Sequence, residues 1–352
     1  MIRVLIADDS PVVRELLCQA LRTDPDVRIA GMATNGHEVV QLAKDIRPDL
    51  ITMDVNMPKM NGLEAIRQIM SEIPTPILVV TSHGENRELE VAFNALASGA
   101  LSVIDKPENF LGEVGDQFTT NLLAQVHAFS CQKVRRIPPE GHRSPSGSTT
   151  IPIVEGPRIT YDAIAVGTSA GGPVALSKLL MLLPKDLDAP VLIVQHITQG
   201  FLSSFVRWLS KQVSREILIA YDGQEAEPGA IYFAPEDLHL EITSVRRLRL
   251  VRSAPLNGFR PSVDRLFQSV AQSFKERSIG LLLTGMGSDG AEGLREIQRT
   301  GGVTMAQDER TSLVFGMAKQ ALNIGAVDQV LPLEVIASKL TDLVGCRRSK
   351  AS

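Results

Sequence analysis

The sequence predicts an α/β protein built from two doubly wound domains whose sheets are mostly parallel. Short β-branched runs alternate with segments of helical period, which is the order that βαβ units produce. Runs such as VLIA at 4–7 and ILVV at 77–80 are apolar at consecutive positions. Both faces of such strands must be buried, as in a parallel sheet covered by helices. A length of 352 residues fits two domains of roughly 150 residues each.

The first half of the chain predicts a five-stranded, flavodoxin-like domain at residues 1–128. Its expected elements, in order, are RVLIAD, a helix from Pro11 to Leu21, RIAGM, a helix after Gly36, DLITMD, a helix after Gly62, PILVVT and LSVID. We expect a flexible linker at 129–158. Residues 134–158 gather proline, glycine, serine and threonine with little apolar periodicity, which is typical of a linker.

The second half predicts a larger α/β/α hydrolase domain at residues 159–345. It begins with DAIAVG, a helix from Pro173 to Leu183, PVLIVQ and a helix from Phe201 to Leu209. Four short strands follow, EILIAY, AIYFAP, LHLEI and RLRLVR. Their close spacing and their turns predict an antiparallel β-hairpin insertion. A helix over 262–277 with one apolar stripe and the buried strand GLLLTG then resume the α/β pattern.

The composition argues against several classes of protein. The formal net charge of -4, from 36 basic and 40 acidic residues, gives no field that would attract nucleic acid, and no basic helix-turn-helix pattern occurs. No apolar run is long enough for a signal peptide or a membrane span. Three separated cysteines without metal-ligand spacing suit free thiols in a reducing compartment. We expect a cytoplasmic protein that neither binds nucleic acid nor enters the membrane.

Polar residues follow or end the strands of the first domain, and we expect them to converge, because the carboxyl ends of parallel strands share one edge. They are Asp8, Asp9, Asp54, Thr81 and Lys106. Clustered carboxylates repel one another unless a cation lies among them, and their hard oxygens suit Mg²⁺. Asp54 could then accept a phosphoryl group, with Lys106 and Thr81 binding its oxygens. A single Asp at a strand end would more simply be a solvated cap, but the complete set favours the phosphoryl site.

These residues lie in IADDS, MDVNMPKMNGLE, VVTS and DKP, and together the four motifs resemble the response-regulator receiver family. The resemblance implies that Asp54 is the phosphorylation site and that a histidine kinase is the phosphodonor. It implies Mg²⁺ ligands from Asp8, Asp9, Asp54 and the backbone carbonyl of Asn56. One position departs from the family, because Val103 stands where many receivers carry an aromatic switch residue. A relay through a rotating ring is therefore not expected.

A second candidate site begins with Ser169, in the segment GTSAGG between a strand and a helix. This is the context of a nucleophile elbow, in which glycines permit a tight turn and helix amides can bind an oxyanion. A dinucleotide-binding loop is one alternative, but Ser169 occupies the position of its central glycine. The next strand also ends in Gln195 and His196, without a ribose-binding acid. The other alternative is a plain glycine turn.

Two further residues could complete a hydrolase site with Ser169. His196 ends a predicted parallel strand and could act as the general base. Asp289 follows the buried strand GLLLTG and could orient the imidazole. The alternative for Asp289 is an N-cap of the helix AEGLREI. A lone histidine is more often structural, and His239, inside the expected insertion, is interpreted in that way.

The order Ser, His, Asp differs from that of α/β-hydrolases. The segments GTSAGG, VQHITQGFLSSFVRWL, IYFAPEDLHL, RPSVDRLFQSVA and LLLTGMGSDGAEGL instead resemble the catalytic domain of the chemotaxis protein-glutamate methylesterases, over nearly all of 160–340. The resemblance implies a Ser169, His196 and Asp289 triad without a cofactor in this domain. As a hypothesis, the amides of Met286 and Gly287 form the oxyanion hole. Arg260 could hold a substrate carboxylate or form a salt bridge.

The resemblance implies an esterase that demethylates glutamate methyl esters on chemoreceptors, with release of methanol, and that also deamidates receptor glutamines. It implies that the receiver covers the catalytic cleft until Asp54 is phosphorylated. Two alternatives stay open. One is the same enzyme class acting in a non-chemotactic receptor pathway, or mainly as a deamidase. The other is a receiver-gated binding module or phosphate sink.

Overall fold

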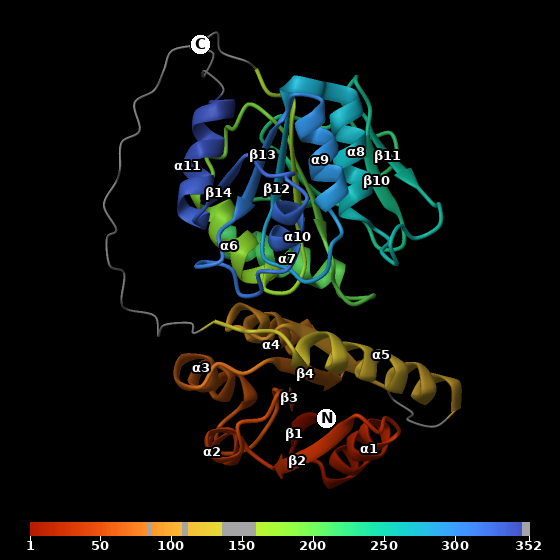
Figure 1. Cartoon of the computed structure of the whole chain (residues 1–352), viewed down its shortest axis with the longest axis vertical. Coiled ribbons are helices and arrows are strands. Elements are labelled where there is room, and N and C mark those ends of the chain that lie inside the picture. The colour runs from red at the N-terminus through yellow and green to blue at the C-terminus, as the bar shows by residue number, and fades with distance from the viewer. Residues whose placement is uncertain (83–85, 108–111, 136–159, 347–352) are drawn as a thin grey trace.

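The computed structural model describes residues 1–82, 86–107, 112–135 and 160–346. Two α/β domains lie one above the other along the long axis of the molecule (Figure 1). The N-terminal domain, coloured red to yellow, places α4 (Asn86–Ala97) and α5 (Gly112–Ser130) toward the C-terminal domain. Helix α5 extends two residues past the expected domain limit at 128. Residues 136–158 of the expected linker lie outside the described residues.

The first domain is a parallel five-stranded sheet in the order β2-β1-β3-β4-β5. Its strands are β1 (Ile2–Ala7), β2 (Val27–Ala33), β3 (Leu50–Met53), β4 (Ile77–Ser82) and β5 (Ser102–Lys106). Besides α4 and α5, its helices are α1 (Pro11–Arg22), α2 (Gly36–Ile46) and α3 (Gly62–Glu72). Side chains of Ser10, Asn35 and Asn61 accept hydrogen bonds from the first turns of α1, α2 and α3, which fixes where these helices begin. The predicted doubly wound domain is confirmed.

The second domain contains a seven-stranded parallel sheet in the order β14-β13-β12-β6-β7-β9-β8. The strands are β6 (Ala163–Thr168), β7 (Val191–Gln195), β8 (Leu218–Ile219), β9 (Ile231–Phe233), β12 (Ser278–Leu282), β13 (Val303–Gln307) and β14 (Gln329–Leu331). The helices are α6 (Gly172–Leu182), α7 (Leu202–Val213), α8 (Val263–Phe274), α9 (Ala291–Arg299), α10 (Met317–Asn323) and α11 (Leu333–Val344). Helix α6 contacts both α7 and α11, and α9 contacts both α8 and α10, which gives the sheet its two helical layers.

The predicted antiparallel insertion is only half right. β10 (His239–Ile242) and β11 (Leu248–Val251) form the expected hairpin. β8 and β9, which were expected to belong to the same insertion, instead pair in parallel and extend the main sheet beyond β7. Short strands usually pair with their sequence neighbours, which is why their spacing suggested hairpins. The segment between Ile219 and Ile231 has room for a parallel crossover, which takes about a dozen residues.

The apolar core runs through the contact between the two domains. The buried side chains of the first domain and those on the α6, α7 and α11 side of the second sheet form one continuous cluster. Phe93 of α4 is 1% exposed and meets the rings of Phe201, Phe205 and Trp208 in the second domain. The α8 and α9 side of the second sheet has a cluster of its own.

Candidate functional sites

The five polar residues predicted to meet in the first domain do converge in part. Lys106 Nζ lies 2.7 Å from Asp8 Oδ2 and 3.0 Å from Asp54 Oδ2. Carboxylate oxygens of Asp8, Asp9 and Asp54 lie within 4.8 Å of one another. Thr81 is buried near the end of β4, which lies between β3 and β5, and its Oγ1 has no hydrogen-bond partner among the described residues. The strand order brings β1, β3, β4 and β5 side by side, so their carboxyl ends open into one pocket.

Charge and burial shape the chemistry of this pocket. Burial raises the pKa of Asp54, and the Asp8 carboxylate adds to this effect while Lys106 opposes it. Burial opposes the charge on Lys106, but attraction to Asp54 and Asp8 outweighs it and raises the pKa of the ammonium group. The single positive charge of Lys106 therefore does not balance the three carboxylates, and Lys106 stays protonated. A divalent cation among the oxygens would relieve this imbalance, so the residues present fit Mg²⁺.

A glycine at the start of α3 keeps the chain close to Asp54. A Cβ atom at Gly62 would lie 2.1 Å from the carbonyl oxygen of Asp54, which no real side chain tolerates. The Gly62 amide donates to the Val55 carbonyl at 3.0 Å, and the Asn56 amide donates to Asp54 Oδ1 at 3.3 Å. These bonds fold the β3–α3 loop back over the pocket. The loop therefore carries the Asn56 backbone beside the acidic cluster.

In the second domain, Ser169 lies at the turn between β6 and α6. Its amide donates to the Thr284 carbonyl at 3.1 Å, and its carbonyl accepts from the Gly172 amide at 2.9 Å. Gly171 has φ +77°, a left-handed conformation that favours glycine, and a Cβ there would meet Leu313 at 2.7 Å. The turn is therefore tight and closely packed, and the partly exposed Ser169 side chain lies at its apex. This is the strand-turn-helix arrangement expected for a nucleophile elbow.

His196 and Asp289 form a hydrogen-bonded pair beside this turn. His196 Nε2 lies 2.9 Å from Asp289 Oδ2, and Asp289 is 1% exposed. His196 Nδ1 is buried and has no hydrogen-bond partner among the described residues. Ser169 and His196 line the same pocket. Within the described chain, no hydrogen bond joins the serine hydroxyl to the ring in this state.

Asp289 is held by the start of α8. Its carboxylate accepts from the Ser262 hydroxyl at 2.7 Å, from the Val263 amide at 2.7 Å and from the Asp264 amide at 3.1 Å. Burial alone would raise the pKa of Asp289, but the hydrogen bond and charge of His196, with these amides, lower it. The carboxylate is therefore ionised and fixed in place. The alternative role as N-cap of α9 is wrong, because Gly290 occupies that position without a side-chain cap.

Other candidate residues fall outside this pair. His239 is 1% exposed and accepts a hydrogen bond from the Ser262 amide at 3.2 Å, as a structural histidine would. Arg260 Nε donates to Asp237 at 2.9 Å, which is the salt-bridge alternative, and this ion pair lowers the pKa of Asp237. Both partners line the larger cleft, which runs between α5 of the first domain and Ser169, His196 and Met286 of the second.

Two residues that contact the candidate triad were not predicted from the sequence. Phe259 stacks on His196, with ring centroids 4.1 Å apart and planes only 6° from parallel. Gln195 donates hydrogen bonds to the backbone of both Ser169 and His196. Phe259 lies far from His196 in the sequence, so no local pattern could indicate this contact. Gln195 stood next to His196, but strand periodicity does not show where its amide points.

A phosphoacceptor-like pocket in one domain and a Ser, His and Asp set in the other define a hydrolase joined to a receiver-type domain. Family models for the response regulator receiver domain and the CheB methylesterase match residues 4–111 and 164–340, respectively. The chain belongs to the CheB methylesterase family.

Two of the relatives are similar to this chain over nearly its whole length, and a solved structure is similar to its second domain. The protein-glutamate methylesterase/protein-glutamine glutaminase 1 of Syntrophus aciditrophicus is 43% identical over 98% of this chain and 99% of its own length. The corresponding protein 4 of Myxococcus xanthus is 40% identical over 97% of this chain and 96% of its own. The Thermotoga maritima CheB methylesterase catalytic domain, a crystal structure, is 36% identical with a TM-score of 0.51, and covers 53% of this chain and 100% of that one.

Proposed function

We propose that this chain is a phosphorylation-regulated serine esterase that demethylates glutamate methyl esters on chemoreceptors and deamidates receptor glutamines. The names of the relatives supply the two reactions. The observation that carries the proposal is the pairing of His196 with a buried, ionised Asp289 beside a serine at an elbow. A carboxylate that orients an imidazole and stabilises its charged form is what a serine hydrolase requires.

The proposed mechanism gives each residue a step. His196 takes the proton of the Ser169 hydroxyl on Nδ1, the ring nitrogen that has no partner among the described residues, while Nε2 stays bonded to Asp289. Ser169 attacks the ester carbonyl, and methanol leaves with the proton returned by His196. Water, activated by the same ring, then hydrolyses the acyl-enzyme. With a glutamine substrate, ammonia takes the place of methanol as the leaving group.

We keep the Met286 and Gly287 amides as the oxyanion donors in this proposal. Met286 lines the cleft beside Ser169, and Gly287 has φ +92°, which turns the loop after β12. A Cβ atom at Gly287 would meet nothing within 4 Å, so there is open space beside this residue. Two backbone donors directed at the developing oxyanion would stabilise the tetrahedral intermediate.

In the first domain, Asp54 is the proposed phosphorylation site, with a histidine kinase as the donor. Mg²⁺, held by Asp8, Asp9, Asp54 and the Asn56 carbonyl, would offset the charge of the phosphoryl group when bound. Lys106 and the Thr81 hydroxyl, which has no hydrogen-bond partner among the described residues, would bind the phosphoryl oxygens. We also keep the proposed domains, with the end of the first one moved from 128 to Ser130, where α5 ends. A cytoplasmic location is supported by three free cysteines. Within the described residues, no helix is long and apolar enough to cross a membrane.

Methanol release from methylated receptor tests the enzymatic half. We expect Ser169→Ala to abolish the release, because the nucleophile is gone. Equal release by this variant, or none by the phosphorylated wild type, would contradict the esterase. A binding module or phosphate sink predicts no methanol at all.

Stimulation by a small-molecule phosphodonor tests the regulatory half. Asp54→Asn should keep basal methanol release and lose the stimulation, because the amide cannot form an acyl phosphate. Stimulation that persists in Asp54→Asn would rule out control through this residue.

A further inference from the structure

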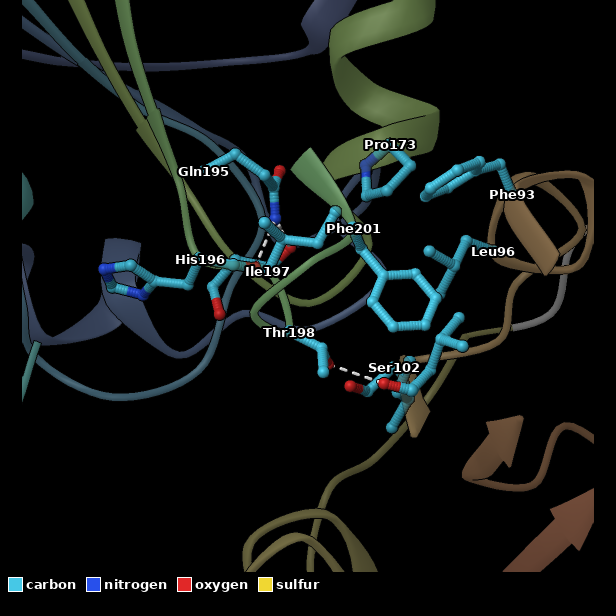
Figure 2. A pocket seen from close by; sticks show the side chains of 12 residues that line it. Phe93, Leu96, Ser102, Pro173, Gln195, His196, Ile197, Thr198 and Phe201 are labelled. Atoms are coloured by element: carbon cyan, nitrogen blue, oxygen red, sulfur yellow. Dashed lines mark hydrogen bonds between the residues drawn. The ribbon is translucent and has the colours of Figure 1, made fainter. Parts of the chain in front are cut away.

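A glutamine side chain joins the backbones of the two proposed catalytic residues. Gln195 is the last residue of β7 and is 6% exposed. Its Nε2 donates to the Ser169 carbonyl at 2.9 Å and to the His196 carbonyl at 2.8 Å, as the dashed lines in Figure 2 show. We propose that Gln195 is a positioning residue that sets the distance between nucleophile and base. This inference rests on the proposed esterase function.

The residue type matches the task. Two carbonyl oxygens need two N–H donors from one small, uncharged group, and a carboxamide NH₂ supplies both. The reverse orientation of the Gln195 amide would turn its own oxygen toward two carbonyl oxygens, so the contacts fix the orientation. A glutamate of the same shape would offer only acceptors and would repel both carbonyls. Gln195 is therefore suited to this position by its donors rather than by its volume.

The sheet leaves a gap that Gln195 fills. Ser169 and His196 follow neighbouring parallel strands, β6 and β7, and the last bond between these strands runs from the His196 amide to the Thr168 carbonyl at 3.0 Å. Beyond that bond, the Ser169 amide turns to Thr284 on the other side of β6. The Gln195 amide restores a link between the elbow and the β7 end. This link joins the backbones of the two residues that carry the proposed reacting side chains.

The packing around the amide explains a glycine of the GTSAGG segment. A Cβ atom at Gly172 would lie 2.0 Å from Gln195 Oε1 and 2.6 Å from Thr168 Oγ1. Gln195 Oε1 is buried and has no hydrogen-bond partner among the described residues, and it lies at the first turn of α6. The positive end of the helix dipole favours a carbonyl oxygen there. Gly172 thus leaves the space that the amide occupies.

Loss of the amide should slow the reaction more than it weakens binding. Without Nε2, the link from the β7 end to Ser169 itself is lost and the His196 amide bond to the Thr168 carbonyl is left to hold the two strands together. Displacements of about 1 Å in a catalytic group cost on the order of 100-fold in rate. Substrate contacts made elsewhere in the cleft would remain. The expected signature is therefore a fall in kcat with little change in KM.

Three variants of the full-length protein test this role. Gln195→Met keeps much of the volume without donors, Gln195→Glu keeps the shape, and Gly172→Ala displaces the amide without changing it. Each should lower kcat for methanol release by about 10- to 100-fold with KM within about 3-fold of wild type. The matched control is Thr304→Val on β13, which removes a buried hydroxyl bonded to Asp328 at 2.9 Å. It should lower Tm and leave kcat unchanged.

A pH profile separates positioning from a general loss of stability. The carboxylate introduced by Gln195→Glu lies next to His196 and should raise the pKa seen in kcat/KM, whereas Gln195→Met should not. Wild-type kcat in Gln195→Met and Gly172→Ala, or a loss no larger than that of Thr304→Val at equal Tm, would overturn the inference. If Ser169→Ala still releases methanol, the proposed esterase function is wrong, and methanol release no longer tests the role of Gln195. A fluorophosphonate probe then reports Ser169 reactivity directly, and unchanged labelling of Gln195→Met would overturn the positioning role.

Discussion

At the scale of single residues, the ring of Phe259 bears directly on His196. The two rings are stacked 4.1 Å apart, and Phe259 is only half-buried. The face of an aromatic ring carries partial negative charge and attracts a cation. During the proposed reaction the imidazole becomes an imidazolium, so this contact strengthens when the charge appears. Phe259 therefore holds the ring plane and favours its charged form.

Replacing Phe259 with leucine should expose this contribution. Loss of the π face removes about 0.5–1 kcal/mol of stabilisation from the imidazolium that forms during the reaction, which should reduce kcat/KM by about 2- to 5-fold. Phe259→Tyr retains an aromatic face and should behave like wild type. The kcat/KM for methanol release measures both effects. A value for Phe259→Leu equal to that of wild type would show that the ring is only a spacer.

At the scale of elements, α8 and α9 form a reciprocal exchange of hydrogen bonds, in which the N-terminus of each helix binds a carboxylate that lies at the start of the other. Asp289, just before α9, accepts from the first amides of α8. Asp264, in the first turn of α8, accepts in return from the Gly290 amide at 2.9 Å and the Gly293 amide at 2.7 Å at the start of α9. Each negative group lies at the positive end of the other helix. This exchange fixes the loop that carries the proposed triad acid.

Asp264 gives this exchange a pH dependence. Burial raises the pKa of Asp264 to about 6, with the nearby Asp289 charge adding to it and the Gly293 and Gly290 amides opposing it. A carboxyl with a raised pKa binds more protons in the folded state, so its contribution to stability falls as pH rises from about 4 to about 7. Asp264→Asn removes that titration. The difference in unfolding free energy, wild type minus variant, should therefore decrease over this range.

Urea unfolding at several pH values measures this difference. The variant keeps an oxygen acceptor for the two glycine amides, so it should fold. A difference that is constant with pH, or that rises, would show that Asp264 does not titrate in this range. Asp222→Asn, at an exposed position on the loop after β8, is the control for the substitution itself.

The sequence predicted most elements because their patterns are local. Consecutive apolar residues identified the parallel strands, and Ser169 and His196 could be placed at one sheet edge from strand order alone. Asp289 was predicted to orient His196, but the contacts that hold Asp289 in place could not be found in this way. Its alternative role was an N-cap of AEGLREI, whereas the hydrogen bonds that hold it come from Ser262 and Val263 at the start of α8, more than twenty residues earlier in the chain. The parallel pairing of β8 and β9 depends in the same way on long-range contacts.

At the scale of the whole molecule, the first domain packs against the second through α4 and β5. The Trp208 indole donates to Asn94 Oδ1 at 3.0 Å, and the Thr198 hydroxyl donates to the Val103 carbonyl at 2.6 Å. Thr198 lies two residues after His196, so this contact reaches the edge of the proposed catalytic site (Figure 2). Val103 was singled out in the sequence for lacking an aromatic ring. Its backbone carbonyl makes the contact instead, which no side-chain pattern could predict.

Phe93 is the apolar centre of this contact, and its removal should release the second domain. Phe93→Ala deletes a ring packed against Phe201, Phe205 and Trp208, leaving the catalytic residues untouched. Truncating a buried phenylalanine costs on the order of 3–5 kcal/mol, and part of that loss falls on the domain contact. The open population should grow, so methanol release without phosphodonor should rise and further stimulation through Asp54 should shrink. Val12→Ala, at a position on α1 that is 65% exposed, should change neither. Basal activity that stays at the wild-type level in folded Phe93→Ala would mean that this contact does not restrain the enzyme.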